Sequence, residues 1–134
     1  MSGNTSCPFC EIALDASHER LLHQNPFGFV IRDGFPVTEG HSLIIPRRHI
    51  ASFFDLTEEE RPALFALLDL AKAELDELYG PDGFNIGIND GPAAGQTVTH
   101  LHIHLIPRYA GEGGDPRGGV RWVVPSKADY WSKK

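Results

Sequence analysis

The sequence lacks most features of secreted, membrane-bound and nucleic-acid-binding proteins. It has only two cysteines, and its 12 lysines and arginines are outnumbered by 18 acidic residues, which gives a formal net charge of −6. Two cysteines do not make a disulfide scaffold, and an acidic chain lacks the basic face with which a general nucleic-acid binder displaces counterions. No apolar stretch approaches the roughly 20 residues that a membrane-spanning helix needs. We therefore expect a soluble protein whose partners are neither nucleic acid nor membrane.

The N-terminal segment, residues 1–6, is polar and has no apolar centre of the kind found in signal peptides. The protein is therefore expected to be cytoplasmic, unless an export signal has been removed. A chain of 134 residues is long enough to bury its own core. No repeat, low-complexity tract or linker interrupts it, so residues 1–134 are expected to form a single domain.

Hydrophobic patterning and turn signals predict several short strands. A strand, a turn at residues 25–28 and a second strand are expected between Leu21 and Ile31. Further strands are expected over His41–Pro46, Phe84–Ile88, Val98–Ile106 and Val120–Val124. A loop is expected over residues 111–119.

One long helix and one short helix complete the prediction. Thr57 and Glu60 have the spacing of a capping box. After them, apolar residues recur at helical spacing on one face: Leu64, Leu67, Leu68, Ala71, Leu75 and Leu78. Gly80-Pro81 should end this helix, and a short helix is expected over Glu11–Ala16. The order of strands and helices favours an α+β domain with an antiparallel sheet.

Three histidines alternate with apolar residues in the segment His100-Leu101-His102-Ile103-His104. Alternate side chains of a strand point to opposite faces, so we expect the three imidazoles on one face and the apolar residues in the core. A single histidine would most simply be an ordinary polar residue. Three in perfect alternation after a glycine-rich loop indicate a functional site.

Two chemistries fit such a row of histidines. One is metal binding, as in some catalytic zinc sites, although same-face neighbours on a strand lie about 7 Å apart and suit a single ion poorly. The other is nucleophilic attack on phosphorus by a neutral imidazole. The preceding loop, residues 89–97, offers glycines, backbone N–H groups, an amide and a hydroxyl that suit phosphate oxygens. The loop therefore favours the second chemistry.

Cys7 and Cys10 form a Cys-Pro-Phe-Cys motif. In a reducing compartment this spacing indicates either half of a metal site or a redox pair. A thioredoxin-like redox motif would follow a strand, and the sequence before Cys7 supplies none. Metal binding is therefore the favoured interpretation.

The segment from Asn89 to Arg108 resembles the signature of the histidine triad (HIT) family, His-x-His-x-His followed by two apolar residues, and in particular its fragile-histidine-triad and bacterial branch. The segment Gly40–Ile50 resembles a second motif of that family, and the resemblance extends from Cys7 to about Arg108. It implies a HIT-like fold with about five antiparallel strands, one long helix and a shorter N-terminal helix. It also implies a homodimer that hydrolyses diadenosine polyphosphates and related nucleotides.

Carried over to this sequence, the resemblance implies that His102 is the nucleophile. His102 would attack the α-phosphorus and form a nucleotidyl-histidine that water then cleaves. Asp33 falls where the family places a residue that binds the ribose hydroxyls. Contacts to the nucleotide or its phosphates are implied for His41, Asn89, Gly95, Gln96, Thr97, Val98 and His104.

The resemblance also implies a structural zinc ion. Its ligands would be Cys7, Cys10, His49 and His100, and two thiolates with two imidazoles suit a closed tetrahedral zinc site. Such a site would fix the orientation of His100 beside the nucleophile. The alternative is that both cysteines are free.

Several functions stay open alongside hydrolysis of dinucleoside polyphosphates. Hydrolysis of nucleoside phosphoramidates, and transfer of the nucleotidyl group to phosphate or another acceptor, would use the same histidine intermediate. The protein could also be a nucleotide-binding regulator without turnover, or a hydrolase whose triad binds a catalytic metal. Trp122 and Trp131 are expected to serve in packing or dimer contacts.

Overall fold

The computed structural model of this chain describes residues 7–132. The absence of a signal peptide was inferred from residues 1–6, which lie outside this range. Within residues 7–132, no helix combines the length and the apolar character needed to cross a membrane.

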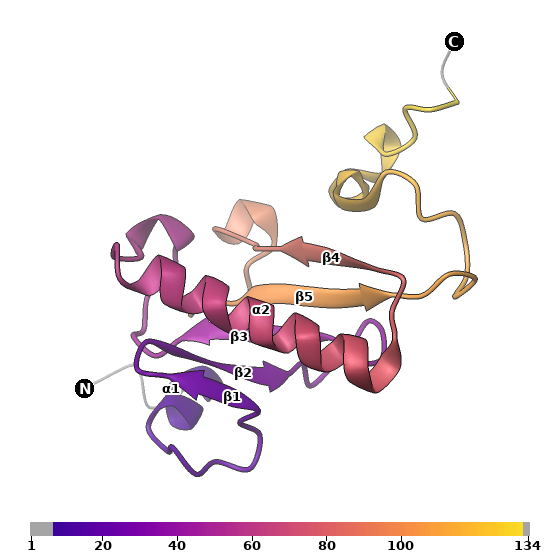
Figure 1. The fold of residues 1–134 in the computed structure, drawn as a ribbon. Helices are drawn as coiled ribbons and strands as arrows, with labels where there is room; N and C mark the ends of the chain where they lie inside the picture. The colour runs from indigo at the N-terminus through magenta and orange to yellow at the C-terminus, as the bar shows by residue number, and fades with distance from the viewer. Residues whose placement is uncertain (1–6, 133–134) are drawn as a thin grey trace.

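A five-stranded antiparallel sheet forms the centre of the molecule (Figure 1). Its strands are β1 (His23–Asn25), β2 (Gly28–Arg32), β3 (Ser42–Pro46), β4 (Gly83–Gly87) and β5 (Ile103–Arg108). They lie in the order β1-β2-β3-β5-β4, and every neighbouring pair is antiparallel. The expected α+β class with about five antiparallel strands is confirmed.

The long helix α2 (Glu60–Tyr79) begins with the predicted capping box. The Thr57 N–H donates to the Glu60 carboxylate at 2.8 Å, and the Glu60 N–H donates to the Thr57 hydroxyl at 3.1 Å. Gly80, with a φ of 59°, ends the helix in a left-handed cap. Leu78, predicted on the apolar face, is instead 57% exposed.

The two faces of the sheet bury different residues. Helix α2 covers the first face, where its Leu64, Leu67, Ala71 and Leu75 pack with Val30, Ile44 and Leu105. The second face is covered over β2 and β3 by the short helix α1 (Pro8–Ala13), which packs near Phe29, Ile31 and Ile45. His104 and Ile106 of β5 lie on this second face, since Ile103 and Leu105 lie on the first.

Close packing of α2 on the sheet requires glycine at position 28. The turn before it is confirmed at the predicted place: the Asn25 side-chain oxygen accepts from the N–H groups of Phe27 at 2.9 Å and Gly28 at 3.0 Å. A Cβ atom at Gly28 would lie 2.6 Å from a methyl of Leu64 and 2.8 Å from the carbonyl oxygen of Ile45. The turn and the helix therefore fix each other's positions.

Three predicted elements differ in the structure. Helix α1 covers Pro8–Ala13 rather than 11–16, because the Cys7 side chain caps it by accepting from the Cys10 N–H and Pro8 fits its first turn. The strand predicted over Val98–Ile106 begins only at Ile103. The strand predicted over Val120–Val124 is the 3₁₀ helix η4 (Gly119–Val123), followed by η5 (Pro125–Lys127). Two further short 3₁₀ helices are η2 (Phe53–Asp55) and η3 (Pro92–Ala94).

Candidate active site and metal site

The three alternating histidines do not share one face, which corrects the sequence-based expectation. His100 is fully buried and turns toward the N-terminal cysteines, whereas the rings of His102 and His104 lie side by side with centroids 5.1 Å apart. The reason is that residues 98–102 are not part of the strand. The Leu101 N–H donates to the Ile50 carbonyl at 2.7 Å. This segment therefore runs beside Ile50, beyond the end of β3, before β5 begins at Ile103.

The position of His102 leaves one of its ring nitrogens free to react. Its Nδ1 lies 2.8 Å from the carbonyl oxygen of His100, and a carbonyl can only accept a hydrogen bond. Nδ1 therefore carries the proton of the neutral ring, and Nε2 carries the lone pair. The ring also packs against Phe9, with centroids 5.2 Å apart. This is the protonation state that a nucleophilic imidazole needs.

In His104 the ring proton lies on the other nitrogen, Nε2, because of a contact with His41. The Val37 N–H donates to Nδ1 of His41 at 3.0 Å, so the proton of neutral His41 is on Nε2. That Nε2 lies 3.0 Å from Nδ1 of His104 and 3.4 Å from the Asp33 carboxylate. Nδ1 of His104 therefore accepts a hydrogen bond, and its Nε2–H is left as a donor.

Both histidines of this pair are held in their neutral form. Burial, together with the neighbouring His102 and His41, lowers the pKa of His104 to about 4. Burial also lowers the pKa of His41, partly opposed by the charge of Asp33. His41 is only 2% exposed. At neutral pH, His104 therefore offers one defined N–H group rather than a positive charge.

His102 and His104 line a cavity of about 480 Å³, called here the main pocket. Most residues predicted to bind a nucleotide line it: Asp33, His41, Asn89, Gly95, Thr97, Val98, His102 and His104. Gln96 does not line it, because its side chain accepts from the Gly91 N–H and donates to the carbonyls of Ala51 and Val98. Gln96 thus holds the loop in shape instead of facing the pocket.

Sequence reasoning missed the apolar wall of the main pocket. Phe9, Phe35, Val37 and Leu43 line it together with Arg20. No motif marks these residues individually, although Phe9 lies inside the Cys-Pro-Phe-Cys motif. Apolar walls with a few polar groups, here including Asp33, are the usual composition of a small-molecule site.

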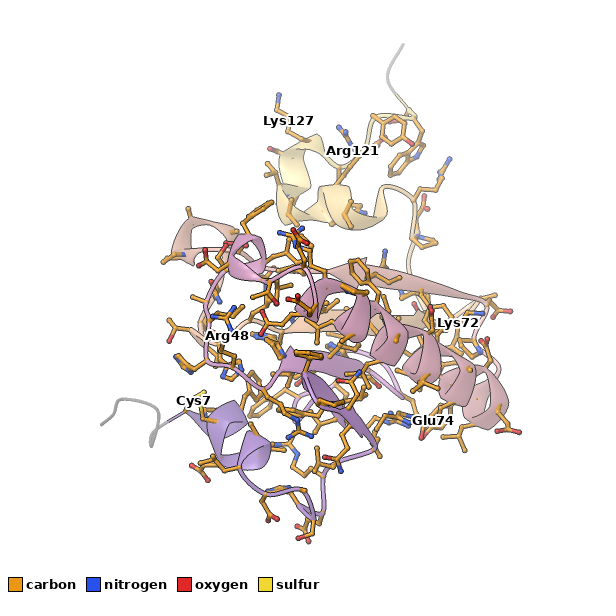
Figure 2. The ribbon with its side chains drawn as sticks, turned by 60° about the vertical axis from the view of Figure 1, so that its left-hand side comes forward. Cys7, Arg48, Lys72, Glu74, Arg121 and Lys127 are labelled. Carbon is orange, nitrogen blue, oxygen red and sulfur yellow. The ribbon has the colours of Figure 1, made fainter. Side chains whose placement is uncertain are left out.

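The four predicted metal ligands come together beside the main pocket. Nδ1 of His100 lies 3.4 Å from Sγ of Cys7 and 3.5 Å from Sγ of Cys10, and Nδ1 of His49 lies 3.1 Å from Sγ of Cys10. All four ligand atoms lie within 4.8 Å of one another. Figure 2 shows Cys7 at the start of α1, on the side of the molecule where the chain enters the fold.

The chemistry of this cluster fits a tetrahedral zinc ion. Zinc bonds to sulfur and nitrogen at tetrahedral angles place these atoms about 3.6 Å apart, close to the observed separations. Nε2 of His100 lies 2.7 Å from the Pro46 carbonyl. Because a carbonyl only accepts, the proton of neutral His100 is on Nε2, and the lone pair of Nδ1 points toward the cysteines. Burial, with the neighbouring Cys7, raises the pKa of the Cys10 thiol to about 11 in the protein without a cation.

Comparison with known proteins identifies relatives of this chain. The model of the HIT domain family matches residues 16–111. Protein hit of Bacillus subtilis is 36% identical over 116 residues, which cover 86% of this chain and 78% of that protein. The bis(5'-adenosyl)-triphosphatase of Saccharomyces cerevisiae is 34% identical over 114 residues, which cover 84% of this chain but about half (52%) of the yeast protein.

Solved structures agree with these sequence relatives. A zinc-bound histidine triad family protein from Mycobacterium smegmatis superimposes with a TM-score of 0.73 and is 32% identical, with 94% of this chain and 96% of that chain covered. A HIT family protein from Bacillus anthracis gives a TM-score of 0.72 at 30% identity, with 91% of this chain and 89% of that chain covered. The match of the domain model over most of the chain, together with these relatives, shows that the chain belongs to the histidine triad (HIT) family.

Proposed function

We propose that this protein hydrolyses nucleotides at the α-phosphorus through a covalent intermediate on His102. The observation that carries the proposal is the hydrogen bond of His102 Nδ1 to the His100 carbonyl, because it leaves the lone pair of Nε2 on a side chain that lines the main pocket. A neutral imidazole in that state is a competent nucleophile. Family membership supports a nucleotide substrate, since relatives include an enzyme named for hydrolysis of bis(5'-adenosyl) triphosphate.

In the first step, Nε2 of His102 forms a bond to phosphorus and the bond to the leaving group breaks. The leaving group keeps the electron pair, and Nε2–H of His104 donates to the departing atom. A phosphate leaves as the anion that this hydrogen bond stabilises, whereas an amine or alcohol takes its proton from the solvent while His104 keeps its own. In the second step, water attacks the nucleotidyl-histidine, returns a proton to the solvent and releases the nucleoside monophosphate. Donors held in place for the departing atom supply a few kcal/mol of transition-state stabilisation.

The walls of the main pocket suit the nucleoside half of the substrate. Asp33 offers a carboxylate oxygen to the ribose hydroxyls, while Phe9 and Leu43 offer apolar surface to the base. Asn89 and Thr97, the two ends of the glycine-rich loop, would face the phosphates. As part of the same proposal, residues 1–134 act as one HIT domain, in a homodimer and in the cytoplasm.

We further propose a structural zinc ion held by Cys7, Cys10, His49 and His100. The fit of the donor atoms supports it, and so does the zinc-bound relative. When bound, the ion would cross-link the N-terminal segment to the sheet. Because the His100 ring would be a ligand and the His100 carbonyl holds His102, the ion would also steady the nucleophile.

Nucleotide release from diadenosine triphosphate and from adenosine 5'-phosphoramidate tests this function. The wild-type protein is expected to release adenosine monophosphate, and His102→Ala is expected to abolish release. The control is His18→Ala, which lies outside both the main pocket and the cysteine–histidine cluster and should keep the wild-type rate. Undiminished release by His102→Ala would refute the nucleophile, and absence of release by the wild type would favour a binding role.

A further inference from the structure

Arg20 is a charged residue of the main pocket to which the proposed function assigns no task. Among the described residues 7–132, it is the one lysine or arginine that lines this pocket, and Asp33 is the one carboxylate. Arg20 belongs to the turns between α1 and β1, whereas Asp33 directly follows β2. A single cation in a pocket with mainly apolar walls restricts the kind of ligand that the pocket accepts.

The guanidinium of Arg20 lies against the backbone on both sides of Asp33. Its Nη2–H donates to the carbonyl of Arg32 at 2.8 Å, and a Cβ atom at Gly34 would lie 4.0 Å from the same nitrogen. The charged end of Arg20 therefore has a defined place beside Asp33, although the residue is exposed.

Most N–H groups of this guanidinium are available to a ligand. Within residues 7–132, its one hydrogen-bond acceptor is the Arg32 carbonyl, so four of the five N–H donors of a guanidinium remain. No carboxylate in this range forms an ion pair with Arg20. Other arginines of the chain are paired: Arg32 with Glu74, Arg48 with Glu60, Arg108 with Glu112 and Arg117 with Asp115. Arg20 therefore brings an unpaired charge and free donors to the pocket wall.

The contacts of Asp33 indicate which part of a nucleotide Arg20 would meet. The Asp33 carboxylate faces the histidines, with one oxygen 4.0 Å from Nδ1 of His104, whereas Arg20 lies along the backbone on either side of Asp33. In a nucleotide, the base and the 5'-phosphate project from opposite sides of the ribose ring. With the α-phosphorus at His102 and the ribose hydroxyls at Asp33, the base therefore extends toward Arg20.

We propose that Arg20 recognises the base and that the main pocket selects a 6-oxopurine nucleotide, one that carries guanine or hypoxanthine. This inference rests on the proposed function. In these two bases O6 and N7 are neighbouring acceptors on one edge, and two N–H groups of a guanidinium match both of them. Adenine has an amino group in place of O6, so its N–H would face the N–H groups of Arg20. The guanidinium therefore favours guanine and hypoxanthine over adenine.

A phosphate on the ribose hydroxyls would also attract a guanidinium. Such a phosphate would lie beside the carboxylate of Asp33, and the two negative charges would repel each other. The O6 and N7 edge of a purine is uncharged and meets no such repulsion. The base is therefore the better partner for Arg20, and adenosine 3',5'-bisphosphate distinguishes the two ligands by experiment.

Calorimetric titration with GMP, IMP and AMP tests this recognition without requiring turnover. IMP shares O6 and N7 with GMP but lacks its 2-amino group, so it isolates the edge that Arg20 would contact. The wild-type protein should bind GMP and IMP about tenfold more tightly than AMP, the size of one bidentate contact to a base. Arg20→Met should remove this preference and change the affinity for AMP less than about twofold, because salt screens an exposed charge.

Two further variants separate base recognition from structural and general charge effects. Arg20→Lys keeps the charge but loses the paired donors, and it should retain a preference of about threefold. Lys72→Met removes a cation from α2, which covers the opposite face of the sheet (Figure 2), and it should leave all three affinities unchanged. If Arg20 only held the Arg32 carbonyl in place, Arg20→Met would weaken the binding of GMP, IMP and AMP equally. That result would overturn base recognition.

Hydrolysis of the 5'-phosphoramidates of guanosine and adenosine, which share one leaving group, separates this inference from the proposed function. The guanosine compound should have a kcat/KM about tenfold higher in the wild type, and the two values should become equal in Arg20→Met. Equal wild-type affinities for GMP and AMP, or tighter binding of adenosine 3',5'-bisphosphate than of GMP, would overturn base recognition and leave the nucleotidyl-histidine mechanism standing. Arg20-dependent binding of GMP with no release from either phosphoramidate would overturn the hydrolase and leave base recognition standing.

Discussion

Replacing His104 with glutamine should remove part of the pH dependence of the protein's stability. The pKa of His104 is lowered from 6.5 to about 4, mainly by burial. His102 lies two residues before it in the chain, His41 faces it from just before β3, and Asp33 faces it from just after β2. In the unfolded chain these neighbours are absent, so the unfolded state takes up a proton between pH 6.5 and pH 4 while the folded state does not.

The sign and size of the effect follow from this difference. A base whose pKa is lowered by folding stabilises the fold above the unfolded pKa, and that stabilisation is lost as the pH falls. With the two pKa values 6.5 and about 4, the loss for His104 between pH 7 and pH 5 is about 2 kcal/mol. Its side chain is 21% exposed, so solvent screening reduces this value only modestly.

Urea unfolding at pH 7 and pH 5 measures the effect directly. The free energy of unfolding should fall by about 2 kcal/mol more in the wild-type protein than in His104→Gln over this range. The cysteine–histidine cluster is the same in both proteins, so its titration cancels in the difference. Equal pH dependence in the wild type and His104→Gln would refute the buried, neutral state of His104.

Two other predictions concern stability. Gly28→Ala should destabilise the fold by about 2 kcal/mol because the new Cβ meets the backbone oxygen of Ile45 and a methyl of Leu64. The control is Gly83→Ala, where nothing lies within 4 Å of the new Cβ. Equal melting temperatures for the two variants would contradict the close packing of α2. Removal of bound zinc by a chelator, or Cys10→Ser, should lower the melting temperature and weaken activity because His102 is held less firmly, with complete loss only as the protein unfolds. Complete loss of activity from a protein that is still folded would indicate a catalytic metal instead.

Local sequence signals predicted the parts of the fold that depend on local contacts. The capping box of Thr57 and Glu60 and the turn at residues 25–28 each close within a few residues, so their side chains determine them wherever the chain folds. The antiparallel α+β sheet follows from the order of elements. The C-terminal segment was different: Val120–Val124 has the residues of a strand but forms η4, because the segment packs on itself around Ala128 and Trp122.

For the site, the sequence indicated some residues and missed others. The resemblance to the HIT family named the residues that the structure brings together in the cysteine–histidine cluster and most of those that line the main pocket. Gln96 does not line the pocket, because its side chain bonds Gly91, Ala51 and Val98, and a motif does not show which way an amide side chain turns. The apolar residues of the pocket, and the role of His41 in setting the proton on His104, depend on contacts between segments far apart in the sequence.

The spacing of the triad has a physical reason different from a shared strand face. The ring of His100 lies against the cysteines, while the His100 carbonyl accepts a hydrogen bond from Nδ1 of His102. Position 104 is already inside β5, where the register opposite Leu43 brings its ring to His41. Within β5, a shift of position 104 by one residue would turn its ring to the opposite face of the sheet. Each ring therefore has a different partner, and those partners determine which nitrogen of His102 keeps its lone pair and which nitrogen of His104 carries an N–H.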